Sequence, residues 1–260
     1  MDLQASSPPV EPQRPGDPTS FPVWGPVATL AWSVLIAIAC LFVEVVVMLI
    51  FLFPMRELPR EKAEAAFMNL RFDGTFLSVC ALATLLLSVP LIIGLVKLRR
   101  GSNLKDYLGL RPPPLKQVLR WSLIVLVFCL LTDAILLLLG IPIVTEFMQE
   151  AYASASPRWV AWLAFVIAAP IFEEICFRGF IFKGIAASRL GGRGATVVTA
   201  VLWAATHVRD DWDGIAIVFA LGLVLGAARA MTNSTLLTIW LHGLTNLLAT
   251  AQTAFVLLQN

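Results

Sequence analysis

The chain alternates between long apolar runs and short polar segments. Its seven apolar runs cover residues 24–53, 74–96, 118–145, 159–184, 194–208, 214–231 and 234–258. A helix needs about 20 residues to cross a bilayer, and most of these runs reach that length. The pattern therefore predicts an all-α polytopic bundle of about seven transmembrane helices. Because the fifth and sixth runs are short, the expected count ranges from six to eight.

Composition points to the same class of protein. Hydrophobic residues make up 58% of the 260 residues and charged residues only 14%, whereas a typical soluble domain has about 25% charged residues. The chain therefore has too little polar surface for a water-soluble globule, and we expect membrane lipids to surround it. The net charge of +2 gives no reason to expect a nucleic-acid partner.

A polar, proline-rich tail precedes the first run. Residues 1–22 carry too few large apolar side chains to form a packed core, so the predicted bundle spans residues 23–260. With the N-terminus in the cytoplasm, the inside segments hold 12 Lys and Arg residues and the outside segments 6, with Arg229 counted inside and Arg178 left out. Basic residues favour the cytoplasmic side. We therefore predict a multi-pass protein of the cell membrane with a cytoplasmic N-terminus.

Three charged residues lie within six positions of the fourth run, in the segment PIFEEICFRGF. Charges inside a membrane span are costly and usually pair with one another or serve a function. Glu174 and Arg178 are four residues apart, so they share a helix face and can form an ion pair. Glu173 is rotated by about 100° around the helix axis and points elsewhere. The alternative to a functional site is a structural ion-pair network that ties helices together.

Both histidines of the chain also lie in apolar runs. His207 lies near the end of the fifth run, and His242 in the seventh run has Asn246 four residues later on the same face. With a rise of about 1.5 Å per residue, Glu173, His207 and the His242–Asn246 pair reach similar depths. These depths predict that three helices bring the side chains into a single buried polar site.

Three motifs follow one another on successive predicted helices: Glu173-Glu174-x-x-x-Arg178, Trp203-x-x-x-His207 and His242-x-x-x-Asn246. Together they resemble the CAAX protease and bacteriocin-processing family, also called Abi, whose members are intramembrane glutamic endopeptidases. The resemblance covers roughly residues 118–250, about half of the chain. The family usually has Phe where this chain has Trp203, and we expect that difference to change packing and not chemistry.

The resemblance implies a role for each site residue. Glu173 would be the general base that activates water, and His207 would help to position or share the proton. His242 and Asn246 would stabilise the oxyanion of the tetrahedral intermediate, and the predicted ion pair would hold the helix face in place. The implied substrate is a peptide or protein segment near the cytoplasmic leaflet. A prenylated CaaX tail is the family's eukaryotic substrate. No cofactor is expected for this mechanism.

Three other functions stay open at this point. Glu173, His207 and His242 could instead form the two-histidine, one-carboxylate site of a zinc metalloprotease. A scaffold or immunity protein could keep these residues and act by binding a partner. Glu44 and Asp133, two further acids in apolar runs, could serve a proton-coupled transporter. For each of these two acids we favour a simpler role, a hydrogen bond to a neighbour or a position in a wet crevice.

Overall fold

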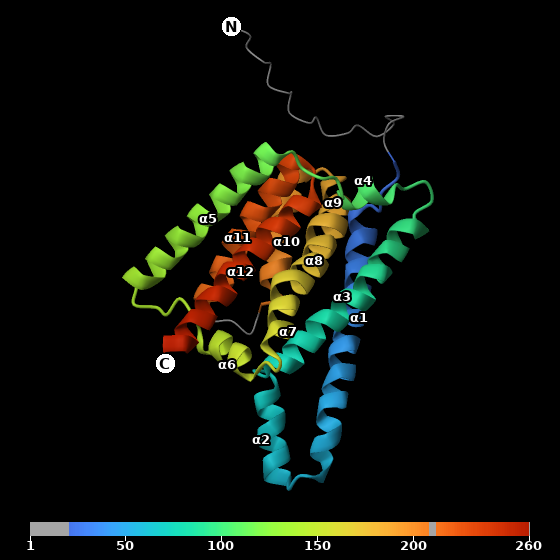
Figure 1. Ribbon diagram of the computed structural model, residues 1–260. Coiled ribbons are helices and arrows are strands. Elements are labelled where there is room, and N and C mark those ends of the chain that lie inside the picture. The colour runs from blue at the N-terminus through green and yellow to red at the C-terminus, as the bar shows by residue number, and fades with distance from the viewer. Residues whose placement is uncertain (1–20, 208–211, 260) are drawn as a thin grey trace.

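The computed structural model of the protein describes residues 21–207 and 212–259. Most of these residues are helical, and the described part of the chain contains no β-strand. The predicted all-α polytopic bundle is therefore confirmed (Figure 1). Most of the predicted N-terminal tail, residues 1–20, lies outside the described residues.

Within the described part of the chain, six helical stretches are long and apolar enough to cross a membrane, as expected of a multi-pass integral membrane protein. They are α1 (Pro26–Leu52) with the 3₁₀ turn Phe53–Glu57, α3 (Gly74–Leu98), α5 (Leu115–Leu138), the composite stretch Arg158–Ala186, α11 (Trp212–Thr232) and α12 (Thr235–Gln259). In Figure 1, α1 begins at the face opposite to the one where α12 ends. The start of the first spanning helix and the end of the last one therefore lie at opposite ends of the bundle.

The fifth predicted helix is shorter than the sequence pattern suggested. The structure has α10 (Gly191–Ala204), which is about 21 Å long at 1.5 Å per residue and ends three residues before His207. The third predicted helix also ends early, at Leu138 instead of residue 145. Gly140 adopts a left-handed φ of 70° there, a conformation that glycine allows and that commonly ends a helix.

Three short helices lie at the two ends of the bundle. They are α2 (Arg60–Leu70), α4 (Leu104–Leu108) and α6 (Glu146–Ser154). The hairpin of α1 and α2 extends beyond the rest of the bundle (Figure 1). Tyr107 of α4 stacks on Phe180, with ring centroids 5.8 Å apart, and burial raises the pKa of Tyr107 to about 12. This stacking attaches α4 to the composite helix that carries the predicted site.

The composite helix contains two π-helical turns. Its parts are α7 (Arg158–Trp162), the π turn Leu163–Ala168, α8 (Ala169–Glu174), the π turn Ile175–Ile181 and α9 (Phe182–Ala186). Pro170 in α8 cannot donate a backbone hydrogen bond, and its ring needs room near the preceding turn, which the wider π turn before it provides. Short π-helical segments often occur at functional sites, and here they flank the two glutamates of α8.

Three charged residues outside the motifs, Asp133, Glu44 and Arg229, differ in their surroundings. Gln252 of α12 donates a hydrogen bond of 2.8 Å to Asp133, which confirms the expected bond to a neighbour, and Glu44 is exposed on the surface of α1. Arg229 was wrongly counted as an inside loop residue. It lies in the last turn of α11, is only 2% exposed, and donates from Nε to the Arg178 carbonyl at 2.8 Å.

Candidate active site

The two adjacent glutamates of α8 have different surroundings. Glu174 is fully buried, and its Oε1 accepts a hydrogen bond of 2.8 Å from Nη1 of Arg178. The predicted ion pair is therefore present, and both of its side chains are fully buried. Glu173 is only half-buried. Because adjacent residues are rotated by about 100° around the helix axis, Glu174 faces the packed interior while Glu173 keeps part of its side chain exposed.

His242 completes the buried ion pair from α12. Its Nδ1 lies 3.1 Å from Oε1 of Glu174, and the side chain is 3% exposed. Since a carboxylate only accepts hydrogen bonds, this contact places a proton on Nδ1 of His242. Arg178 also donates from Nη2 to the Gly222 carbonyl of α11 at 3.2 Å. Glu174 and Arg178 thus hold α8, α11 and α12 together around the site.

Trp203 of α10 lies at the centre of the predicted residues. Its indole Nε1 donates a hydrogen bond to Oε2 of Glu173. Its ring contacts the rings of His207 and His242 edge-on, at centroid distances of 5.2 and 5.1 Å. The Arg178 guanidinium lies over the same ring, 4.6 Å from its centroid. The expected change in packing is accompanied by this hydrogen bond to Glu173, which phenylalanine could not make.

His207 lies beyond the end of α10 but stays against it. Its Nδ1 is 3.0 Å from the Trp203 carbonyl and 3.3 Å from the Thr206 hydroxyl. A carbonyl accepts hydrogen bonds and cannot donate them, so this contact places a proton on Nδ1. Nε2 is then the nitrogen of the neutral ring that can accept a proton. The structure thereby brings His207 close to Glu173 through their shared contact with Trp203.

Asn246 has a partner that the sequence did not predict. Its Nδ2 donates to the Phe165 carbonyl at 2.8 Å, within the first π turn. Arg229 makes the equivalent contact to the Arg178 carbonyl in the second π turn. Each π turn therefore offers a carbonyl to a side chain of a neighbouring helix. An amide nitrogen carries two hydrogens, so Asn246 keeps a second donor.

Arg229 is the charged residue of this region that sequence reasoning missed. Its guanidinium is buried against the Phe182 ring, 5.2 Å from the ring centroid, and donates to Oδ1 of Asn233 at 2.6 Å. Its position inside an apolar run, four residues before Asn233, was the available signal. Arg178 pairs with Glu174, whereas the neutral oxygens of the Arg178 carbonyl and Asn233 hold the buried Arg229 guanidinium.

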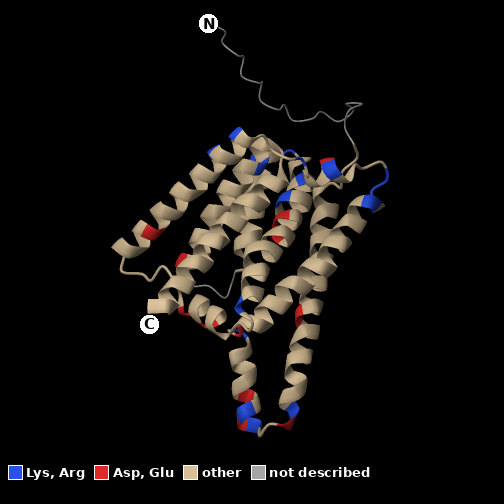
Figure 2. Cartoon of the chain, in the orientation of Figure 1, with Lys and Arg blue, Asp and Glu red and all other residues tan. Residues whose placement is uncertain are grey.

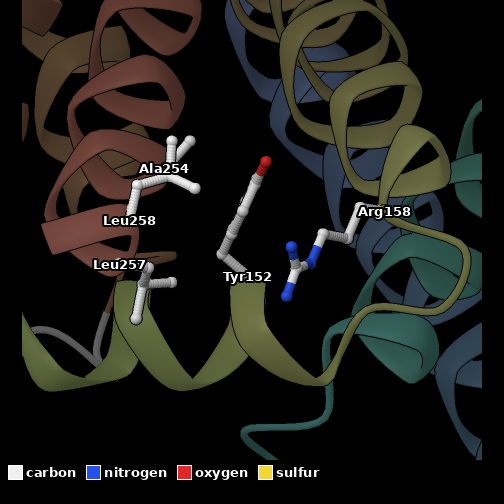
Figure 3. A pocket seen from close by; sticks show the side chains of 5 residues that line it. All are labelled: Tyr152, Arg158, Ala254, Leu257 and Leu258. Carbon is white, nitrogen blue, oxygen red and sulfur yellow. The ribbon is translucent and has the colours of Figure 1, made fainter. Parts of the chain in front are cut away.

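Two features bear on this cluster, its metal-ligand geometry and a surface pocket elsewhere in the bundle. Among the described residues, no group of three or more His, Cys, Asp or Glu side chains is arranged to hold a metal ion. A pocket of about 80 Å³ is lined by Tyr152, Arg158, Ala254, Leu257 and Leu258 (Figure 3). Leu257 is 15 residues beyond His242 on α12, roughly 22 Å along the helix, so this pocket is separate from the glutamate and histidine cluster.

The fold and the cluster define a multi-pass membrane protein in which a half-buried glutamate lies beside two histidines and a buried ion pair. Residues 155–248 match a family model described as type II CAAX prenyl endopeptidase Rce1-like. This match confirms the resemblance to the CAAX protease and bacteriocin-processing family and covers all six predicted site residues. It supports a CAAX-protease-like endopeptidase, which is a hydrolase. No curated protein and no solved structure gives a significant match.

Proposed function

We propose that this protein is an intramembrane endopeptidase in which Glu173 activates the water that hydrolyses a peptide bond. The observation that carries the proposal is the setting of the Glu173 carboxylate. Oε2 accepts from Trp203, whereas Oε1 has no hydrogen-bond partner among the described residues. A half-buried carboxylate with one oxygen held and one oxygen open can position a water molecule and accept its proton.

The proposed reaction proceeds in two steps. Glu173 takes a proton from water while the water oxygen bonds to the carbonyl carbon of the substrate, and the carbonyl oxygen becomes an oxyanion. A protonated His242, donating from Nε2, and the second amide hydrogen of Asn246 stabilise that oxyanion. The carbon–nitrogen bond then breaks, and Glu173 returns the proton to the leaving amine. His207 helps to position or share the transferred proton through Nε2.

The proposed substrate is a peptide or protein segment close to the cytoplasmic leaflet, with or without a lipid anchor. The basic residues at one end of the bundle support this side assignment (Figure 2). We place the protein in the cell membrane with its N-terminus in the cytoplasm, because Lys and Arg are retained on that side. The mechanism requires no resident metal, since Glu173 itself is the base.

The test is cleavage of membrane-proximal and CaaX-type peptides by purified protein in detergent. We expect wild-type protein to cleave at least one peptide with or without a chelator, and Glu173→Gln to lose the activity because a neutral amide cannot accept the proton. Glu44→Gln, a change of an exposed acid outside the cluster, should leave it intact. Each variant is first checked for correct folding by its elution profile and thermal unfolding.

The other outcomes point to other functions. Activity that a chelator abolishes and zinc restores would favour a metalloprotease built on the same side chains. Cleavage that survives Glu173→Gln would show that the base has been misassigned. A biological function that Glu173→Gln retains in cells would favour a scaffold or immunity protein.

A further inference from the structure

Trp203 contacts several side chains of the candidate site, and one of these contacts is a hydrogen bond. The side chain is 1% exposed, yet its only polar atom is used on Glu173. Its ring touches both histidines and the Arg178 guanidinium. One side chain thus contacts the candidate base, both histidines of the candidate site and one half of the buried ion pair.

The indole hydrogen bond determines which way the Glu173 carboxylate faces. A glutamate side chain has three rotatable bonds, and an unanchored half-buried carboxylate would sample several orientations. A donor fixed at Oε2 selects one orientation and leaves Oε1 without a hydrogen-bond partner among the described residues. Hydrogen bonds to charged groups are stronger than those between neutral groups, so this single donor can hold the carboxylate.

The donor itself is rigidly held. Trp203 lies in the last turns of α10, and α10 packs closely along α11. A Cβ added at Gly222 of α11 would lie 3.2 Å from Cε3 of Trp203, so the indole lies against bare backbone. The Arg178 guanidinium faces its ring as a cation–π partner. With only 1% of the side chain exposed, these contacts surround the indole and restrict its movement.

From these contacts we propose that Trp203 is a positioning residue, whose indole N–H fixes the Glu173 carboxylate for water activation. The inference rests on the proposed function and adds a specific requirement to it. The ring fills space, as any large aromatic would, but the N–H is the part that acts on the reaction. Replacing Trp203 by phenylalanine should therefore preserve the core while the base loses its orientation.

The kinetic test distinguishes the contribution of the indole ring from that of its N–H group. Trp203 is replaced by phenylalanine and, site-specifically, by 3-benzothienylalanine, which keeps the bicyclic ring and puts sulfur in place of N–H. Both variants should lower kcat by about 10-fold to 100-fold, the effect of one hydrogen bond to a charged group, with KM unchanged. A loss in kcat without a change in KM indicates an interaction that matters in the chemical step and not in binding.

Trp240→Phe is the matched control. Trp240 lies on α12, two residues before His242, and its indole donates to the Ser122 hydroxyl at 3.0 Å. The variant loses an indole hydrogen bond to a partner outside the candidate site, so kcat should stay at the wild-type value. A benzothienyl variant with wild-type kcat would overturn the proposal, because it would show that the ring suffices.

A second measurement does not depend on activity. The chain has eight tryptophans, whose indole N–H signals can be recorded by NMR after ¹⁵N-tryptophan labelling, and Trp203→Phe identifies the signal of Trp203 by its loss. Glu173→Ala should shift that signal and leave the Trp240 signal in place, whereas Ser122→Ala should do the reverse. An unmoved Trp203 signal in Glu173→Ala would overturn the proposal. A shifted signal in a protein that cleaves no peptide would support the contact and contradict the proposed function.

Discussion

At the scale of single residues, neighbouring positions in one helix have opposite surroundings. Glu173 and Glu174 are adjacent in sequence, but only Glu174 is sealed into the interior with Arg178 and His242. Spacing alone predicted this division, because residues four apart share a helix face and adjacent residues do not. The same reasoning could not predict the bond from Trp203 to Glu173, since that bond depends on how α10 is rotated against α8.

The buried ion pair yields a stability prediction. Arg178→Met removes the cation and leaves the Glu174 carboxylate buried without its partner, which costs about 3–5 kcal/mol when a buried pair is broken on one side. We therefore expect Arg178→Met to unfold at a clearly lower denaturant concentration or temperature in detergent than the wild type. An unchanged midpoint would mean that the Glu174 carboxyl is neutral or that water reaches it.

Arg60→Met is the control for that measurement. Arg60 pairs with Glu64 at 2.8 Å, but its side chain is 91% exposed. Exposed pairs contribute little because water screens them. The unfolding midpoint should therefore hardly change, and a large shift there would indicate a role of the α2 surface that the ion pair does not explain.

At the scale of elements, α10 and α11 approach each other through small residues. Gly222 and Gly226 of α11 are four residues apart and face α10, in the Gly-x-x-x-Gly spacing that allows membrane helices to pack closely. This packing holds Trp203 and, beyond the helix end, His207 near Glu173. The helix pair thereby positions these two side chains of the site region, although α10 itself is too short to span a bilayer.

Gly226→Ala tests this packing. The added Cβ would lie 2.8 Å from Cγ2 and 3.1 Å from Cα of Thr196, so the backbones would have to separate. Overpacking of this kind typically costs about 1–3 kcal/mol, and the displacement of α10 should also reduce peptide cleavage. Thermal unfolding and activity in detergent measure both effects. A variant as stable and active as the wild type would show that the helices have room to adjust.

Gly94→Ala provides the comparison for the glycine change. Gly94 lies inside α3 and is exposed, and an added Cβ there would meet nothing within 4 Å. Alanine favours the helix over glycine by up to about 1 kcal/mol, so this variant should be at least as stable as the wild type. Because helix propensity predicts a gain for both changes, an equal loss of stability in the two variants would show that the contact between α10 and α11 is not the cause.

At the scale of the whole molecule, hydropathy predicted the fold class and the limits of most helices. The apolar runs correspond to α1, α3, α11, α12 and the composite helix within a few residues. The π turns were not predictable, since they leave the apolar pattern of the run unchanged and follow from Pro170 and from side chains of other helices. The burial of Arg229 was missed for a related reason, because a charge near a helix end resembles a loop residue until its partners on the composite helix are known.

The charge distribution predicts which end of the bundle faces the cytoplasm. Exposed Lys and Arg residues gather at the end that carries α4 and the segment after α9, whereas α6 lies at the opposite end (Figures 1 and 2). Arg189→Cys and Glu150→Cys place single thiols at exposed positions on these two ends, in a background whose four native cysteines are replaced by alanine. A membrane-impermeant maleimide applied to intact cells should label Glu150→Cys, and Arg189→Cys only after permeabilisation. The reversed pattern would put the N-terminus outside. Glu173, His207 and His242 lie within the bundle in either orientation. The reversed pattern would therefore change the proposed side of substrate entry and not the candidate site.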